Sequence, residues 1–173
     1  MTIFVTSDLH AFHKNILKYE TETRPFSDLE EMHEVMIERW NSVVSNSDIV
    51  YILGDVSFGK EKETLDFLER LNSSKKRLII GNHDYKMIKN ESFCNHFEWV
   101  KLYSEEKING IQTIMMHFPI ASWHRKNWGA IMLHGHCHGK PTNVEGKIKD
   151  VGWGITGNVV SFDSIIDEMT NII

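Results

Sequence analysis

Five short groups of polar residues along this chain have the types and spacings of metal ligands. In chain order they are Asp8-x-His10, Gly54-Asp55, Gly81-Asn82-His83-Asp84, His117 and Gly135-His136-x-His138. Two ligands separated by one residue at a strand end point the same way, so the two residues of the first group, and the two of the last, can bind a single metal ion together. Carboxylate and amide oxygens mixed with imidazole nitrogens suit Mn, Fe, Zn, Co or Ni. The sequence therefore predicts a site for divalent metals of this kind.

The first three groups each end a short apolar run, which is typical of a buried strand. These runs are Ile3–Asp8, Ile49–Asp55 and Arg77–Asn82. Helical spacing of apolar residues follows each run, over Ser27–Val44, Glu61–Leu71 and Tyr85–Phe97. Ser27 and Glu30 form the capping box that should begin the first helix. The order βαβαβα predicts a sheet whose strands end at one shared crevice, where the metal-binding groups should meet.

The second half of the chain changes to short strands. They are expected over Trp99–Tyr103, Lys107–Ile108, Gln112–Met116, Ala130–His134, Lys147–Val151 and Val159–Val160. The Asn109-Gly110 pair lies between two of them and is the strongest short hairpin signal. An amphipathic helix over Phe162–Ile172, begun by Ser161 or Asp163, should close the chain. Because no repeat or linker interrupts the sequence, residues 1–173 are expected to form one domain with two sheets.

The composition is that of an ordinary globular domain, with 41% hydrophobic and 25% charged residues. A net charge of -5 and a pI near 6.0 disfavour tight binding to long nucleic acid and suit a small anion. The two cysteines, Cys94 and Cys137, lie outside any CxxC pattern, so neither a disulfide framework nor a thiolate zinc site is expected. No apolar run has membrane-spanning length, and the first residues do not resemble a signal peptide. We therefore expect a cytoplasmic protein with no membrane anchor.

The five groups, complete and in this order, resemble the motifs D-x-H, G-D, G-N-H-D/E, H and G-H-x-H of the calcineurin-like metallophosphoesterase superfamily. The resemblance spans Thr2 to about Asp163 and is to the short, cap-free bacterial or phage-type members. Each fragment alone is weak, whereas five together at predicted strand ends are highly specific. The resemblance implies an α/β fold, a four-layer αββα sandwich with two mixed β-sheets and a metal site at the C-terminal strand ends.

The resemblance also implies a role for each motif residue. One metal ion would be held by Asp8, His10, Asp55 and His138, and the other by Asp55, Asn82, His117 and His136. Asp55 would bridge the two ions, for which Mn²⁺ is the leading expectation, with Fe, Zn, Co or Ni as alternatives. Such a pair activates a water for in-line attack on phosphorus. His83, which is left off the metals, would protonate the leaving oxygen, with Asp84 or Asp55 orienting or polarising it.

The expected reaction is hydrolysis of a phosphodiester, in a small nucleotide-like substrate. Protein phosphatases of the superfamily follow the second motif with Asp-Arg-Gly, whereas this chain continues Val56-Ser57-Phe58-Gly59. This departure, with Asp84 where those enzymes usually have Glu, counts against a phosphoprotein substrate. Two alternatives stay open. One is a phosphomonoesterase that uses the same metals, and the other is a scaffold module that has lost catalysis, against which the retained His83 argues.

The candidates for contact with the substrate are Asn82, His13, His124 and Arg125. An arginine near the metals can clamp a phosphate through two hydrogen bonds, but simple surface charge explains Arg125 equally well. His13 follows the first motif, where a solvated loop histidine is the alternative interpretation. His134, two residues before His136, is expected to support the site rather than to bind metal.

Overall fold

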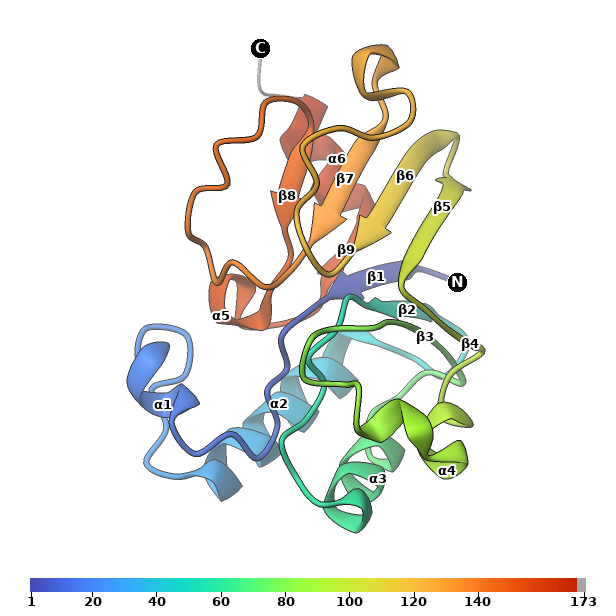
Figure 1. Cartoon of the computed structure of the whole chain (residues 1–173). Helices are drawn as coiled ribbons and strands as arrows, with labels where there is room; N and C mark the ends of the chain where they lie inside the picture. The colour runs from blue at the N-terminus through green and yellow to red at the C-terminus, as the bar shows by residue number, and fades with distance from the viewer. Residues whose placement is uncertain (171–173) are drawn as a thin grey trace.

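The structure, a computed structural model, describes residues 1–170, which form two β-sheets (Figure 1). The first sheet has the order β4-β3-β2-β1-β9. Its strands are β1 Ile3–Thr6, β2 Ile49–Ile52, β3 Lys75–Ile79, β4 Trp99–Lys101 and β9 Val160–Ser161. Strands β1 to β4 run parallel, and β9 pairs with β1 in the antiparallel sense. Parallel neighbours need crossover connections, which the helices of the first half supply.

Helices α2, α3 and α4 cover the face of the first sheet that points away from the second sheet (Figure 1). The helical elements of this half are α1 Ile16–Tyr19, α2 Leu29–Val43, α3 Glu61–Glu69, the 3-10 helix η1 Met87–Lys89 and α4 Glu91–Cys94. Met32, Met36 and Trp40 lie at helical spacing on α2 and are buried together with Phe67 and Leu68 of α3. Removal of this apolar stripe from water holds the helices against the sheet.

The predicted capping residue of α2 is wrong by one position. The helix begins at Leu29 with Asp28 as its cap, because the Asp28 carboxylate accepts a hydrogen bond from the Glu31 N–H at 2.9 Å. The Glu31 carboxylate accepts in turn from the Ser27 N–H at 2.7 Å, so Ser27 and Glu30 are not the capping pair. Aspartate caps a helix as well as serine does, so residue type alone does not favour Ser27 over Asp28.

The single helix predicted over Tyr85–Phe97 is also wrong, because η1 and α4 divide it. Asn90 lies between them, and its side chain accepts a hydrogen bond from the Phe93 N–H at 3.3 Å, which caps α4. Asparagine competes in this way with the hydrogen bonds of a continuous helix. Apolar periodicity alone therefore overstated the length of the element.

The second sheet has the order β5-β6-β7-β8. Its strands are β5 Tyr103–Ile108, β6 Ile111–Met116, β7 Ile131–His134 and β8 Ile148–Asp150. The predicted hairpin is confirmed: β5 and β6 are antiparallel, and the φ angles of Asn109 and Gly110 are 48° and 86°. The strand predicted over Trp99–Tyr103 is wrong as a unit, because β4 ends in the first sheet and β5 begins in the second. Periodicity cannot show which sheet a short strand joins.

The two sheets pack face to face around a shared core. Val5 of β1 and Leu53, which directly follows β2, belong to the same buried cluster as Met115 and Leu133 of the second sheet. Helix α6, Phe162–Thr170, adds apolar side chains to this cluster, and the predicted end of that helix at Ile172 lies outside the described residues. The outer face of the second sheet is covered by a loop that carries the buried Trp123 and the 3-10 helix η2, Lys126–Trp128. The expected α/β fold with two mixed sheets is confirmed.

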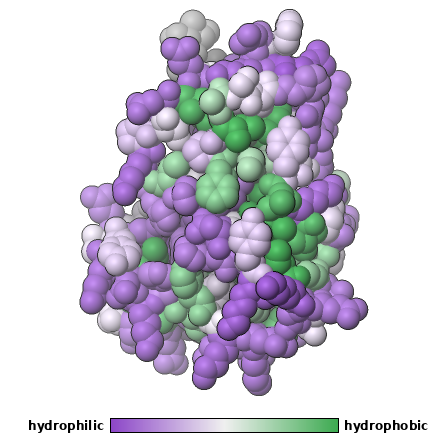
Figure 2. Space-filling view, in the orientation of Figure 1, coloured by the Kyte–Doolittle hydropathy of each residue, from purple (hydrophilic) through white to green (hydrophobic). Residues whose placement is uncertain are grey.

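The surface in Figure 2 is mostly hydrophilic, with hydrophobic residues gathered near the middle of this face. Within residues 1–170, no helix has both the length and the apolar character needed to cross a membrane.

Candidate active site

The predicted metal ligands lie in loops that directly follow strands, and most of them have unusual backbone. Five of them have left-handed φ angles: Asp8 (54°), His10 (48°), Asp55 (57°), His136 (67°) and His138 (49°). This conformation is costly for residues other than glycine and persists only where the surrounding structure enforces it. Its concentration at these positions points to a functional site.

Two motif glycines allow the ligand loops to approach one another closely. A Cβ atom on Gly81 would lie 2.2 Å from Asp55 Oδ1, and one on Gly135 would lie 2.2 Å from Asp8 Oδ2. No side chain fits at such distances without displacing the carboxylate. The glycines in these motifs are therefore required by the packing of one ligand loop on the next.

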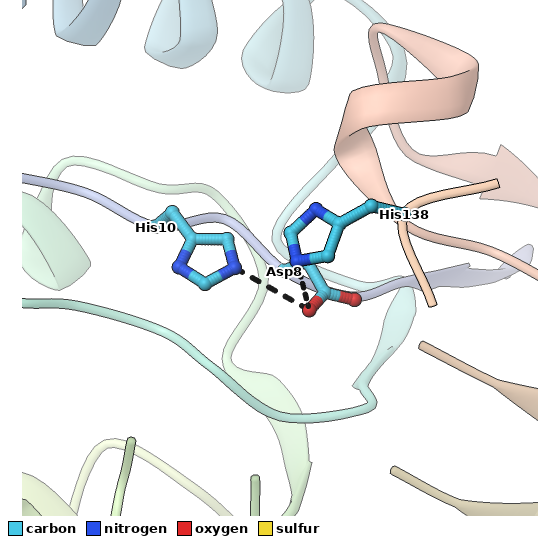
Figure 3. A group of neighbouring side chains, drawn as sticks. All are labelled: Asp8, His10 and His138. Carbon is cyan, nitrogen blue, oxygen red and sulfur yellow. Dashed lines mark ion pairs between the residues drawn. The ribbon is translucent and has the colours of Figure 1, made fainter. Parts of the chain in front are cut away.

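Asp8, His10 and His138 form the first ligand group (Figure 3). Asp8 Oδ1 lies 3.4 Å from His10 Nε2 and 3.8 Å from His138 Nε2. The two imidazole rings stack with their centroids 5.0 Å apart. Three ligand atoms from loops after β1 and β7 therefore face one point.

Asp55 joins this group to a second one. Its Oδ2 atom lies 3.9 Å from His10 Nε2 and 3.5 Å from His117 Nε2. Asn82 Oδ1 lies 3.0 Å from His117 Nε2 and 3.0 Å from His136 Nδ1. All seven predicted ligands thus come together, and Asp55 lies between the two sets; its bridging role stays a prediction.

The first group fits a metal ion because three of its buried polar atoms lack hydrogen-bond partners within the described residues. Asp8 Oδ1 and both ring nitrogens of His10 are buried and have no hydrogen-bond partner among residues 1–170. Burial would raise the pKa of Asp8, but the contact with His10 and the charges of His117 and His10 outweigh it and lower the pKa to about 2. An ionised carboxylate beside unpartnered imidazole nitrogens is the donor set that a divalent cation completes.

Asp84 is buried next to the ligand loops, and its carboxylate accepts hydrogen bonds from their backbone N–H groups. Its carboxylate accepts hydrogen bonds from the N–H groups of Asp55 at 2.8 Å, Gly81 at 2.8 Å and Val56 at 2.9 Å. Burial raises the pKa of Asp84, and these backbone N–H groups act in the opposite direction. Asp84 therefore fastens the Asp55 loop to the Gly81 loop, and its expected effect on the His83 ring stays a prediction.

His83 stands at the edge of the ligand set. Its backbone N–H donates to Asp55 Oδ1 at 2.9 Å, and its ring Nε2 lies 3.9 Å from Asp55 Oδ2. The ring packs on Phe58 with centroids 4.4 Å apart, and 44% of the side chain is exposed. His83 is thus held next to the ligands while it remains open to solvent and to a substrate.

A cleft of about 760 Å³ opens on the side of His10, His83 and His138. The segment after His13 forms the opposite wall of the cleft. The residues that line the cleft include His13, Lys18, Tyr19, Phe58 and Lys140. His13 therefore lines the cleft, which agrees with the interpretation of His13 as a candidate substrate contact and not with that of a solvated loop histidine.

Two predicted substrate contacts lie elsewhere. The exposed His124 pairs with Glu105 of β5 at 2.5 Å, and Arg125 is the left-handed residue that precedes η2. Neither residue lines the cleft. Their role as substrate contacts is an untested prediction that this geometry does not favour. His134 is buried at the end of β7, and its expected supporting role stays a prediction.

Sequence reasoning missed Glu20 and Arg24, which are buried beside the first ligand group. Glu20 contacts the metal-ligand candidate His138, and Arg24 contacts Glu20. Isolated charged residues in a loop give no periodic or motif signal, so nothing in the sequence distinguishes these two from solvated residues.

The sequence model of the calcineurin-like phosphoesterase family matches residues 1–155, which include all five motifs. The chain is 38% identical over 138 residues to an uncharacterised protein, MJ1445, of Methanocaldococcus jannaschii, covering 79% of this chain and 69% of that one. It is 28% identical over 198 residues to the Gene 66 protein of Mycobacterium phage L5, covering 96% of this chain and 93% of that one.

One solved structure has closely similar architecture along its whole length. It is a protein of unknown function, AQ665, from Aquifex aeolicus, with a TM-score of 0.72 at 20% identity. The alignment covers 97% of this chain and 98% of that one. At this identity the likeness concerns the fold alone.

Proposed function

Because the chain belongs to the calcineurin-like phosphoesterase family, we propose that it is a two-metal phosphodiesterase that acts on a small nucleotide-like substrate. The observation that carries the proposal is the convergence of the seven predicted ligands from separate loops, two of which, His10 and His138, line an open cleft. Unpartnered buried atoms of Asp8 and His10 support metal binding at this point. A site whose ligands only filled structural roles would satisfy those atoms within the protein.

Two divalent cations bound there would polarise the phosphoryl oxygens and lower the pKa of a water toward ~7. We assign the remaining proton transfer to His83. Its backbone contact with Asp55 fixes its position, and its exposed ring faces the cleft in which the leaving group would lie. An imidazole at this place can hold a proton and deliver it to the leaving oxygen.

The cleft supports a small substrate that carries a ring. Its volume of about 760 Å³ is typical of small-molecule sites. Phe58 and Tyr19 offer exposed aromatic faces, and Lys18 and Lys140 offer positive charge. A nucleotide combines the two features that such walls recognise, a planar base and additional phosphate.

The reaction class is tested with the Mn²⁺-loaded protein on bis-p-nitrophenyl phosphate and p-nitrophenyl phosphate, followed by cyclic dinucleotides and cyclic mononucleotides. We expect faster turnover of the diester. Preference for the monoester would overturn the diester assignment in favour of a phosphomonoesterase. Absence of turnover with both metals bound would instead favour a scaffold module.

The role of His83 is tested by His83→Asn, which should lower kcat by roughly 10²–10⁴, as expected for loss of a general acid, without loss of bound metal. His96→Asn is the matched control, because His96 follows α4 and does not line the cleft. If the His83 variant hydrolysed the diester at the normal rate, the proton would have to come from another group.

A further inference from the structure

Two charged residues that belong to no motif are buried next to the site. Arg24 is 1% exposed and Glu20 is 9% exposed, and both follow the short helix α1. A buried charge is costly unless it is paired and fully hydrogen-bonded. The arrangement of this pair therefore requires an explanation in terms of what it contacts.

Glu20 divides its two carboxylate oxygens between two partners. Oε1 lies 2.5 Å from His138 Nδ1, and Oε2 accepts from Arg24 Nε at 2.5 Å. His138 Nε2 is the nitrogen on the side of Asp8 Oδ1, at 3.8 Å. With Nδ1 held by a carboxylate, the ring presents Nε2 to the candidate metal position, which is the usual arrangement of a metal-binding histidine.

Arg24 continues the same contact chain to the first motif. Its Nη2 donates to the Asp8 carbonyl oxygen at 2.8 Å, and its Nη1 donates to the Leu9 carbonyl oxygen at 3.0 Å. These carbonyls belong to the turn in which both Asp8 and His10 have left-handed φ angles. One buried ion pair thus connects the loop after β1 to the loop after β7.

We propose that Glu20 and Arg24 form a positioning pair for this metal site. Glu20 fixes the orientation and tautomer of His138, and Arg24 fixes the turn that carries Asp8 and His10. The inference rests on the metal assignment proposed above. The inference adds that a segment without predicted metal ligands, residues 20–24, holds Asp8, His10 and His138 in their binding geometry.

The space around Glu20 supports this assignment independently. A Cβ atom on Gly154 of the short helix α5, Trp153–Thr156, would lie 2.2 Å from Glu20 Oε1. Thr23 Oγ1 donates to the Gly154 carbonyl oxygen at 2.9 Å, which fixes the segment against α5. The carboxylate therefore fits only because this position lacks a side chain.

The direct test is Glu20→Gln, which keeps the shape of the side chain and removes its charge. Mn²⁺ binding would be measured by calorimetry and electron paramagnetic resonance on protein first freed of metal. One of two sites should weaken by roughly 10- to 100-fold, the usual effect of losing a carboxylate behind a ligating histidine, while the other site keeps its affinity. Glu22→Gln is the control, because it removes the same charge from an exposed residue of the same loop.

Two further measurements separate positioning from a general effect on folding. Gly154→Ala displaces Glu20 without removing a charge, so it should weaken the same metal site. In a His138→Ala background, Glu20→Gln should weaken the remaining affinity less than it does in the wild-type protein, because only its pairing with Arg24 is then left to lose.

The outcomes distinguish this inference from the proposed function. If wild-type protein bound no metal, the proposed function would fail. If wild-type protein and the Glu20→Gln and Gly154→Ala variants all bound two ions equally tightly, only the positioning role would be refuted. Equal weakening by Glu20→Gln with and without His138 would also refute it.

Discussion

The contacts of Asp84 lead to a prediction that separates bracing from catalysis. Asp84→Asn keeps the shape of the side chain but replaces one carboxylate oxygen by an N–H₂ group. Both oxygens accept from backbone N–H groups, so at least one of these three hydrogen bonds is lost and two donors then face one another. Hydrogen bonds to charged groups contribute about 1.5–3 kcal/mol each, and the site is too buried for water to replace the lost one.

We therefore expect Asp84→Asn to lower the free energy of unfolding by about 1.5–3 kcal/mol. For a chain of this length that corresponds to a fall in Tm of about 3–12 °C. The assay is urea and thermal unfolding at pH 8 with a chelator present, so that metal binding makes no contribution. Asp66→Asn is the control, because Asp66 is exposed on α3 and its ion pair with Lys62 should contribute less than about 0.5 kcal/mol.

If Asp84→Asn left the free energy of unfolding unchanged, this reasoning would be refuted, because a buried N–H donor that loses its acceptor must destabilise the protein. A second result would point to the role expected from the sequence. If kcat fell while stability and metal content stayed normal, Asp84 would act on His83 and not on the backbone of the Asp55 loop.

Two other changes test the site and the fold. Asp55→Asn should weaken both metal sites, because this carboxylate lies between the two ligand sets; elemental analysis that still found full occupancy would refute the bridging role. Asp48 accepts from the Ser45 hydroxyl and from the N–H groups of Ser45 and Thr2, which lower its pKa to about 2. Its folded pKa lies below the unfolded value, so its contribution is present above pH ~4 and is lost as the pH falls toward 2. Asp48→Asn should accordingly destabilise the protein at pH 7 and make little difference at pH 2 in urea titrations, and an equal effect at both pH values would refute this explanation.

The parts of the structure that the sequence predicts well are those with local causes. Asn109 and Gly110 form the hairpin turn because two residues with positive φ suffice to make it. The candidate metal ligands are expected to meet because each follows a short buried strand, and the ends of parallel strands lie at one edge of the sheet. Asp28 and Asn90 show the limit of local signals, since each is a capping residue that competes with a plausible alternative nearby.

The parts that could not be predicted depend on contacts between distant segments. Glu20 lies 118 positions from His138 in the sequence, and no spacing rule connects them. His124 follows His117 closely, yet the loop carries it to Glu105 on β5 and not to the cleft. Motif spacing identifies the ligands of a site, whereas it does not identify the residues that hold those ligands or surround the substrate.

The left-handed ligand turns and the buried braces have one physical explanation. Each non-glycine residue in this conformation costs on the order of 1 kcal/mol or more, so the turns at Asp8 and Asp55 would relax if nothing restrained them. Arg24 binds the carbonyl oxygens of the first turn, and Asp84 binds the N–H groups of the second. Both braces are buried side chains outside the ligand set. Buried side-chain hydrogen bonds therefore restrain both turns, so the proposed ions would meet ligands whose backbone is already held in place.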